Sequence, residues 1–294
     1  MLDRPSRSAW GFIAFPLAVV FLFTAMPTAA GVVLSFFEWA GGGSPRFVGL
    51  ENYRALFSGE TFGPALRNTL LFAVLSVPIT VLVAFGFAVV LNASWFRGRT
   101  LARTLLFLPT IISIVAIGFI WRWVLDPGQS GLLNALLAWL GVMDEPIDWL
   151  GNSPRAMGVI IAISIWRGLG FSIVLYLAAL SNVPRSLYEA AAVDGAGPWQ
   201  TTWHIAWPGV RPMTAFLLIT GMIGAMQIFD LPMVMIGTIE QPWTDVLNVY
   251  LYREFTQSRL GFAAAIGVCI LLLTLAVTLA QMWRGRGERG GVFG

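Results

Sequence analysis

The sequence contains no lysine, since all 18 residues counted as Lys or Arg are Arg. A nucleotide-binding P-loop, G-x-x-x-x-G-K-[ST], needs its Lys to reach the β- and γ-phosphates of the nucleotide. This chain therefore cannot carry that motif. If ATP drives its function, the nucleotide binds to another polypeptide, and we expect no cofactor on this chain.

Cysteine and histidine are almost absent. The single Cys269 excludes an internal disulfide, and the single His204 excludes a multi-histidine metal site. One His and one Cys leave almost no material for nucleophilic or zinc chemistry. We therefore expect neither an enzyme nor a metal centre.

Charged residues are also scarce. They make up 11% of the chain, against about 25% in an ordinary soluble domain. Hydrophobic residues make up 57% of the chain, and the mean hydropathy is +0.77. This composition indicates an integral membrane protein. The net charge of only +3, with Arg dispersed at loop ends, argues against a nucleic-acid partner.

The sequence is instead rich in long apolar runs. A transmembrane helix needs roughly 20 mainly apolar residues. The first run continues to Phe37, which is longer than a signal-peptide core, so we expect it to be retained. We predict one all-α domain, residues 1–294, a polytopic membrane helical bundle. Its predicted spans are residues 10–37, 66–91, 104–124, 156–180, 213–236 and 261–283.

The distribution of Arg predicts the orientation. One alternate set of loops and termini carries ten Arg and four acidic residues, and the other set carries seven Arg and ten acidic residues. Because Arg collects on the cytoplasmic side, both termini should be cytoplasmic. In the second outer loop, residues 131–141 read as a short helix that lies in the membrane interface or packs over the bundle.

The inner segment of residues 182–208 has the clearest local signals. Asn182 can cap a helix and Pro184 suits its first turn. Gly195 permits the left-handed conformation that ends this helix, and Pro198 starts a second one. Pro208 should stop the second helix near the membrane. The sequence thus predicts a cytoplasmic helix–turn–helix.

The residues of this segment are suited to contact with another protein. Ala190 and Ala191 make one side of the first helix slim, Glu189 adds charge, and Trp199 and Trp203 add apolar area one turn apart. A rigid knob of this kind can transmit force. The alternative is a plain connector whose Glu189 pairs with Arg185 on a solvated face.

The spacing in this segment resembles a known signature. Glu189-Ala190-Ala191, then Gly195, then nine residues, then Ile205 and Pro208 is similar to E-A-A-x3-G-x9-I-x-L-P of permease subunits in binding-protein-dependent ATP-binding-cassette (ABC) importers. The usual Leu before the final Pro is Trp207 here. The resemblance implies that the segment couples the permease to an ATPase. The coupling residues are then Glu189, Ala190, Ala191, Asp194, Gly195, Trp203, Ile205 and Pro208.

Other stretches resemble the carbohydrate branch of that family, the maltose and glycerol-3-phosphate type. They are residues 47–53, 65–69, 121–133, the stretch after 166–168, and Phe229-Asp230. The resemblance covers residues 47–265. It implies a path for a sugar or a sugar-like solute, with a glycerophosphodiester or polyol as alternative solutes.

The family also implies partners. These are a homologous second permease, with a heterodimer favoured, two ATPase subunits that hold ATP and Mg, and an extracytoplasmic solute-binding protein. The place of such a complex is the inner or plasma membrane of a prokaryote, in contact with lipid. ATP binding would close the ATPase pair and move the 182–208 loop with it.

Two ionisable residues lie within predicted spans, Arg167 and Asp230. Charge in hydrocarbon is costly and therefore indicates function or pairing. They either line the solute path, where Arg donates several fixed hydrogen bonds, or form a structural pair or snorkel. Nearby aromatic and Met residues either stack on sugar rings or pack against helices and lipid. The candidates for the path are Trp166, Arg167, Phe171, Tyr176, Met226, Phe229, Asp230 and Met233.

Two other functions compete with this reading. An ion-coupled secondary transporter needs discontinuous helices and buried acidic residues in paired halves, but Asp230 is the only acidic residue within a predicted span. A membrane-embedded enzyme needs a catalytic set that this chain lacks. An ATPase that co-purifies with the chain would separate the importer from both.

Overall fold

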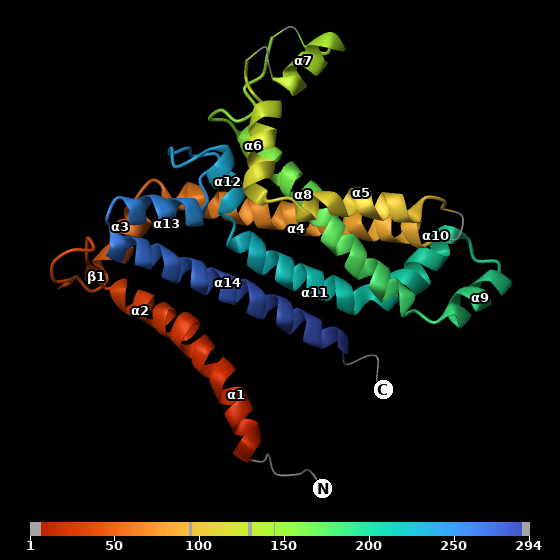
Figure 1. The fold of residues 1–294 in the computed structure, drawn as a ribbon, viewed down its shortest axis with the longest axis horizontal. Helices are drawn as coiled ribbons and strands as arrows, with labels where there is room; N and C mark the ends of the chain where they lie inside the picture. The colour runs from red at the N-terminus through yellow and green to blue at the C-terminus, as the bar shows by residue number, and fades with distance from the viewer. Residues whose placement is uncertain (1–6, 94–95, 129–130, 144, 290–294) are drawn as a thin grey trace. The chain divides into compact units, whose positions relative to one another are not determined.

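The computed structural model describes the backbone of residues 7–93, 96–128, 131–143 and 145–289, and the side chains of these ranges between residues 12 and 283 (Figure 1). Five continuous helical runs in these ranges are long and apolar enough to cross a membrane, and a sixth is added if one bent pair of helices is a single span. The predicted all-α membrane fold is confirmed. The runs are Phe12–Leu34, Phe62–Asn92, Pro154–Ser181, Pro198–Met226 and Leu260–Trp283.

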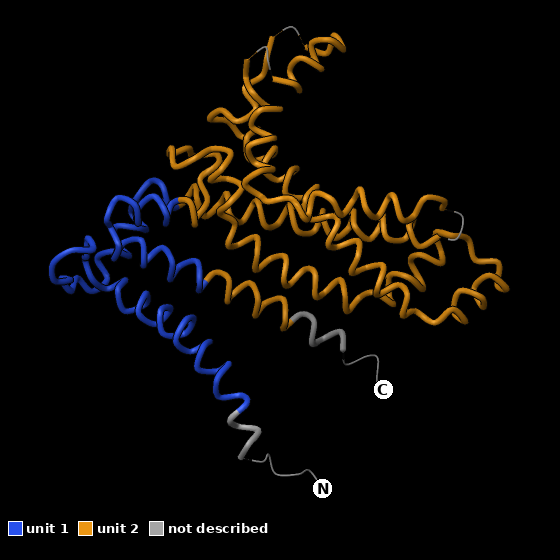
Figure 2. Tube along the Cα trace, viewed as in Figure 1, with its two compact units in different colours: residues 1–62, 250–272 blue, residues 63–249, 273–294 orange. Residues whose placement is uncertain are grey.

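The chain divides into two compact units (Figure 2). Unit 1 comprises Met1–Phe62 and Tyr250–Leu272, and unit 2 comprises Gly63–Val249 and Leu273–Gly294. The orientation prediction uses several Arg near the two termini, and their side chains lie outside the described residues. The same is true of Asp144. The orientation therefore stays a prediction. These Arg residues are Arg4, Arg7, Arg284, Arg286 and Arg289.

In unit 1 the first span is one continuous helical run with a wider turn in its middle. It consists of α1 (Arg7–Val20), the π-helical turn η1 (Phe21–Ala25) and α2 (Met26–Leu34). The Met26 N–H bonds to the Phe21 carbonyl, five residues back. Pro27 follows directly. Because Pro lacks an N–H and clashes with the carbonyl four residues earlier, a turn of wider register lets the helix continue past it.

Residues 47–53, one of the stretches that resemble the family, hold the chain that follows this span against the end of the span. β1 (Phe37–Glu38) pairs antiparallel with β2 (Arg46–Phe47), and Arg46 forms an ion pair with Glu38. The Asn52 side-chain amide donates to the carbonyls of Ser35, at 2.8 Å, and Phe37, at 2.9 Å. Asn52 lies in α3 (Glu51–Ser58), so the motif ties this helix to the end of the first span.

The last helix begins against the same turn. α13 (Leu247–Thr256) is followed by α14 (Leu260–Arg289), and the Leu260 N–H donates to the Trp39 carbonyl at 2.9 Å. A Cβ at Gly261 would lie 1.8 Å from the Phe37 carbonyl oxygen. Only Gly permits this close approach.

Unit 2 holds the larger core. α4 (Phe62–Asn92) and α8 (Pro154–Ser181) are the long helices that the sequence predicted as the second and fourth spans. Small residues let their neighbours approach closely, as is common between membrane helices. A Cβ at Gly170 of α8 would lie 2.5 Å from the Leu106 carbonyl oxygen of α5 (Arg99–Ile111), and a Cβ at Gly221 would lie 2.8 Å from Val77 of α4.

The predicted span of residues 104–124 is not one helix. α5 ends at Ile111, and α6 (Ile114–Val124) leaves it at an angle of 97°. Ile112 and Ser113 are extended, with ψ values of 138° and 133°. Pro109 removes one backbone donor from the last turn of α5, which weakens the helix just before the break.

The predicted span of residues 213–236 is also wrong in its bounds. The helical run begins at Pro198 and ends at Met226, and a separate helix α12 (Asp230–Met235) follows. Pro232 lies in the first turn of α12, a position where the missing N–H costs no intrahelical bond. Asp230 begins this helix, where the positive end of the helix dipole favours an acidic side chain.

Candidate functional site: the 182–208 segment and the solute path

The 182–208 segment begins with a helix of nine residues, α9 (Arg185–Val193). Its N-cap is Pro184 and not Asn182 as predicted. Asn182 instead ends α8, and its side-chain amide donates to the Ala178 carbonyl at 3.2 Å. The residue that could cap α9 is thus already occupied by the preceding helix.

The turn after α9 has the predicted left-handed glycine. Gly195 has a φ of +73°, and a Cβ built on it would meet nothing within 4 Å. The Ala196 N–H donates to the Ala191 carbonyl at 2.9 Å, and the Gly195 N–H donates to the Ala192 carbonyl at 3.2 Å. These bonds close the end of the helix in the Schellman pattern. Gly195 is therefore required by backbone conformation and not by lack of space.

The surface of α9 is largely open. Glu189, Ala190 and Asp194 are exposed, and Ala191 is half-buried. No ion pair joins Glu189 to Arg185, although both side chains are described. Val193 is 88% exposed, which leaves an apolar side chain uncovered at the turn. The face carries both charge and apolar area that no other described part of the chain covers.

One side chain of α9 turns inward. The Tyr188 hydroxyl is buried and finds no hydrogen-bond partner among the described residues. Burial raises the pKa of this hydroxyl above its usual 10.0. The ring therefore contributes apolar packing, while its oxygen adds a desolvation cost.

The second half of the segment does not stop at Pro208 as predicted. α10 (Pro198–Thr201) continues through the π-helical turn η2 (Thr202–Ala206) into α11 (Trp207–Met226). The Trp207 N–H bonds to the Thr202 carbonyl, five residues back. The arrangement repeats that of the first span, where a π-helical turn also precedes one residue and then Pro. The wider turn again lets the helix pass the proline.

The predicted coupling residues of this half lie on the continuous run. Trp203 is 39% exposed, and Ile205 and Pro208 are half-buried. His204 is exposed, and its Nδ1 lies 2.9 Å from the Gln200 carbonyl oxygen. The sequence treated this part as a surface connector. In the structure it is instead the first part of a helical run, Pro198–Met226, that is long and apolar enough to cross a membrane.

Arg167 lies in the middle of α8. Its Nε is buried without a partner among the described residues, and its carbonyl accepts a 3.0 Å hydrogen bond from Thr110 of α5. Asp230 is exposed at the start of α12, and no ion pair joins it to Arg167. The structural pair considered from the sequence is not formed within this chain.

The aromatic and Met residues predicted to line the solute path differ in how far they are buried. Trp166 is 40% exposed and meets Trp121 edge to face, with ring centroids 5.9 Å apart. Phe171 is 51% exposed. In contrast, Tyr176 and Met226 are within 1% of full burial, and Phe229 and Met233 are half-buried. Trp166 and Phe171 are thus the exposed candidates on α8, and Arg167 between them is half-buried.

The sequence reasoning missed several residues that organise these regions. Asn134 braces the loop between α6 (Ile114–Val124) and α8, and Phe85 packs against Trp207 of the 182–208 segment. Trp207 was noted only as a departure from the signature. The four-residue spacing of Trp199, Trp203 and Trp207 was the available signal, because side chains at that spacing share a helix face. Nothing in the sequence placed Phe85 against them.

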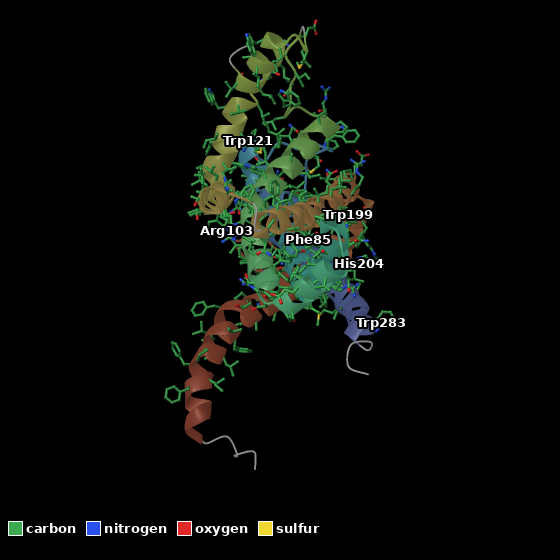
Figure 3. All side chains as sticks on the ribbon, turned by 90° about the vertical axis from the view of Figure 1, so that its right-hand side faces the viewer. Phe85, Arg103, Trp121, Trp199, His204 and Trp283 are labelled. Atoms are coloured by element: carbon green, nitrogen blue, oxygen red, sulfur yellow. The ribbon has the colours of Figure 1, made fainter. Side chains whose placement is uncertain are left out.

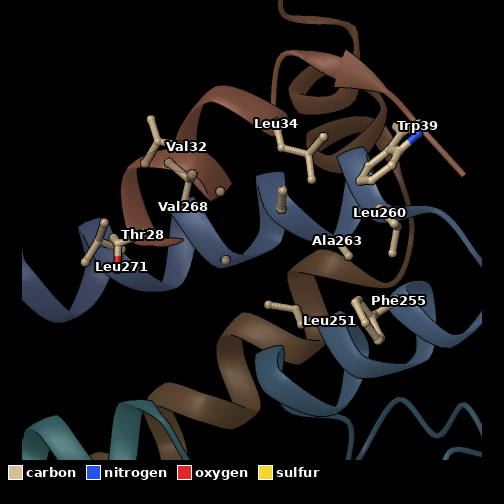
Figure 4. A pocket seen from close by; sticks show the side chains of 13 residues that line it. Thr28, Val32, Leu34, Trp39, Leu251, Phe255, Leu260, Ala263, Val268 and Leu271 are labelled. Carbon is tan, nitrogen blue, oxygen red and sulfur yellow. The ribbon is translucent and has the colours of Figure 1, made fainter. Parts of the chain in front are cut away.

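A pocket of about 450 Å³ lies within unit 1, between α2, α13 and α14 (Figure 4). Its lining is apolar except for Thr28, whose hydroxyl donates to the Thr24 carbonyl at 2.7 Å. A polar solute needs several hydrogen-bond partners, and this pocket offers none. Among the described residues, no group of three or more His, Cys, Asp or Glu could hold a metal ion.

The membrane-crossing helices, together with an exposed helix–turn–helix that continues into one of them, define a multi-pass membrane subunit that is built to contact a partner outside the bilayer. Residues 81–289 match the family described as binding-protein-dependent transport system inner membrane component, and the chain belongs to that family. It is the permease subunit of an ABC importer, and the ATPase of such importers is a separate subunit, as the sequence predicted.

Curated relatives extend the match over most of the chain. The arabinooligosaccharides transport system permease protein AraP of Halalkalibacterium halodurans is 34% identical, covering 87% of this chain and 81% of its own. The lactose transport system permease protein LacF of Rhizobium radiobacter is 31% identical, covering 96% of this chain and 95% of its own. The alternative of an ion-coupled secondary transporter finds no support in these relatives.

A solved structure agrees in fold. A chain of a bacterial alginate ABC transporter, in complex with an alginate pentasaccharide-bound periplasmic protein, superposes with a TM-score of 0.82. It is 27% identical, and the match covers 94% of this chain and 93% of that one. The multi-pass helical fold of an importer permease is therefore established for this chain.

Proposed function

We propose that this permease forms one half of the path for a sugar or a sugar-like solute. Two relatives are named for the transport of arabinooligosaccharides and lactose, and the similar solved structure is an alginate transporter. All three solutes are carbohydrates, which supports the proposal. An external solute-binding protein delivers the solute, and a second, homologous permease completes the path as a heterodimer. Two ATPase subunits hold ATP and Mg.

The 182–208 segment is the proposed contact with an ATPase. The observation that carries this assignment is the combination of an open α9 face and a left-handed Gly195 turn that nothing else in the described chain surrounds. The charged Glu189 and Asp194 and the slim Ala190 side face outward at this turn. Both termini are then cytoplasmic, because the chain crosses the membrane four times before this segment and twice after it when the bent pair of α5 and α6 counts as one span.

The proposed solute contacts lie on α8. Trp166 offers an apolar ring face, Phe171 offers a second, and Arg167 offers donors that hydroxyl or carboxylate oxygens accept. The half-buried Phe229 and Met233 and the exposed Asp230 are proposed to line the same path from the α12 region. Tyr176 and Met226 support α8 and α11 from within the helix packing.

The test of the coupling assignment is a single change at the turn. Gly195→Ala adds no clash, but it puts a side chain at a φ of +73°, which costs about 1–2 kcal/mol. We expect ATP-dependent uptake to fall sharply in proteoliposomes that contain the whole complex, and less ATPase to co-purify. Gly197→Ser is the matched control, because Gly197 has an ordinary φ of −73° and caps α10, where Ser is favoured.

Two results would count against the proposal. One is full uptake and full ATPase recovery with Gly195→Ala. The other is labelling of single-cysteine variants at Asp194 and Glu189 from the external side of intact cells. Competition of uptake by disaccharides, polyols and glycerophosphodiesters, each supplied with the cognate binding protein, then distinguishes the solute classes.

A further inference from the structure

Five aromatic rings form a continuous series in unit 2, which we call the aromatic column: Trp199, Trp203, Trp207, Phe85 and Tyr176. The three Trp come from the run that α10, η2 and α11 form. Phe85 comes from α4 and Tyr176 from α8. Figure 3 labels Phe85 and Trp199 among the side chains at this end of the unit.

Each ring of the aromatic column contacts the next. The centroids of Trp199 and Trp203 are 5.4 Å apart, and those of Trp203 and Trp207 are 5.7 Å apart. Trp207 meets Phe85 edge to face at 4.9 Å, and Phe85 meets Tyr176 at 5.6 Å. These separations lie in the range of favourable aromatic pairs. The series therefore has no gap.

Burial increases steadily along the aromatic column. Trp199 is 73% exposed and Trp203 is 39% exposed, Trp207 is half-buried, and Phe85 is 5% exposed. Tyr176 is fully buried. One end of the column is thus at the surface of the 182–208 segment, and the other end is in the core between the long helices.

The inner end is fixed by a hydrogen bond. The Tyr176 hydroxyl lies 2.9 Å from the Thr214 hydroxyl, which itself donates to the Val210 carbonyl at 3.2 Å. Because the Thr214 proton is used on Val210, Tyr176 donates to Thr214. The column therefore starts on the α11 run, crosses α4 and α8, and returns to α11.

We propose that the aromatic column holds α4 and α8 in register with the 182–208 segment, so that a displacement of this segment by its partner reaches α8 as a unit. This inference rests on the proposed coupling function and adds Phe85 and Trp207, beside the already predicted Trp203, as positioning residues for it. Aromatic side chains have only two rotatable bonds and pack at high density, so they transmit a displacement without yielding. Trp207, which stands where the signature has Leu, supplies the ring that bridges to Phe85.

The test measures solute uptake per ATP hydrolysed in proteoliposomes of the whole complex. Phe85→Leu and Trp207→Leu each keep an apolar side chain but remove the ring contact between Trp207 and Phe85. The Phe85 ring also lies 6.5 Å from the Trp203 ring, so only Phe85→Leu separates all three Trp rings from Tyr176. We expect Phe85→Leu to lower the ratio by about threefold or more, Trp207→Leu to lower it less, and the double variant to lower it no further than Phe85→Leu. Phe87→Leu is the control, because Phe87 lies on the same helix and is 41% exposed.

A conservative variant separates positioning from general packing. Trp207→Phe retains a ring against Phe85, and we expect it to restore most of the ratio that Trp207→Leu loses. The proposal is overturned if both Leu variants keep the wild-type ratio, if the effects of the two changes multiply in the double variant, or if Trp207→Phe is as uncoupled as Trp207→Leu. Gly195→Ala, which changes the turn and leaves every ring of the aromatic column in place, tests the coupling function separately.

Discussion

The indole nitrogen of Trp149 donates a 2.8 Å hydrogen bond to the side-chain oxygen of Asn134. The same oxygen accepts from the Ile147 N–H at 3.3 Å, and the Asn134 amide donates to the carbonyls of Asp126, at 3.1 Å, and Ile147, at 2.9 Å. Asn134 is only 4% exposed. One amide in α7 (Leu132–Trp139) thus fastens both ends of the loop between α6 and α8.

Asn134→Leu should therefore destabilise this loop. The change keeps the side-chain size but leaves two carbonyls, one N–H and one indole nitrogen without partners, at about 1–3 kcal/mol for each group that stays buried. We expect faster proteolysis within residues 126–150 in reconstituted vesicles. Asn152→Leu is the control, because Asn152 is exposed in the same loop. Equal cleavage of the two variants would contradict the bracing role.

Gly170→Ala should separate α5 from α8. The new Cβ would lie 2.5 Å from the Leu106 carbonyl oxygen and 2.7 Å from the Thr110 hydroxyl, so backbone must move, at about 1–3 kcal/mol. We expect a lower thermal midpoint and weaker uptake. Gly158→Ala, on the same helix, meets nothing within 4 Å and should raise stability slightly. If the two variants behaved alike, the close approach would not matter.

Arg167→Met should strongly lower uptake and leave assembly intact. Loss of one charge-assisted hydrogen bond to the solute costs about 1.5–3 kcal/mol, which corresponds to about tenfold or more in uptake. Arg155→Met is the matched control, since Arg155 is exposed near the start of the same helix. Uptake and the yield of purified complex are measured together. Normal uptake with Arg167→Met would remove this residue from the path.

Tyr188→Phe should leave the stability of the purified complex unchanged at pH 7 or raise it by about 1 kcal/mol, because the lost hydroxyl is buried and unpaired. Tyr53→Phe is the contrast, since the Tyr53 hydroxyl lies 2.6 Å from the Ser35 hydroxyl, and it should lower the thermal midpoint. The opposite ranking would show that Tyr188 has a polar partner.

Tyr188 also predicts a pH effect. Burial raises the pKa of its hydroxyl above 10.0 in the folded chain, so the folded state holds this proton more tightly than the unfolded state. Its contribution to stability is complete below pH 10 and is lost as pH rises toward the raised pKa. Wild type should lose more stability than Tyr188→Phe between pH 9 and 11, measured by thermal unfolding.

The sequence predicted elements whose signals are local. The left-handed turn at Gly195 and the start of a helix at Pro198 follow from the backbone preferences of these two residues, and both are confirmed. The apolar runs predicted α4 and α8 within a few residues of their ends, because length and hydropathy suffice to identify a span. The functional class, an ABC importer permease, was predicted from the family resemblance and not from the local signals.

The errors have a common physical origin. Pro208 was expected to stop a helix, but a π-helical turn accommodates it, and a hydropathy pattern does not register that change of turn. The break at Ile112 and Ser113 lies inside a predicted span, and Pro109 is a local sign that the helix is weak there, but hydropathy alone does not show that the chain turns. The contacts of Phe85 and Asn134 join residues far apart in the chain, which one sequence without relatives cannot pair.

The bend of 97° between α5 and α6 restricts what can surround the permease there. Two extended residues interrupt the helical hydrogen bonds, and Ser113 is exposed in the single chain. Hydrocarbon cannot solvate bare peptide groups, so a break of this kind within a bilayer excludes acyl chains. Where the α5–α6 pair crosses the membrane, its corner must therefore face water or protein and not lipid.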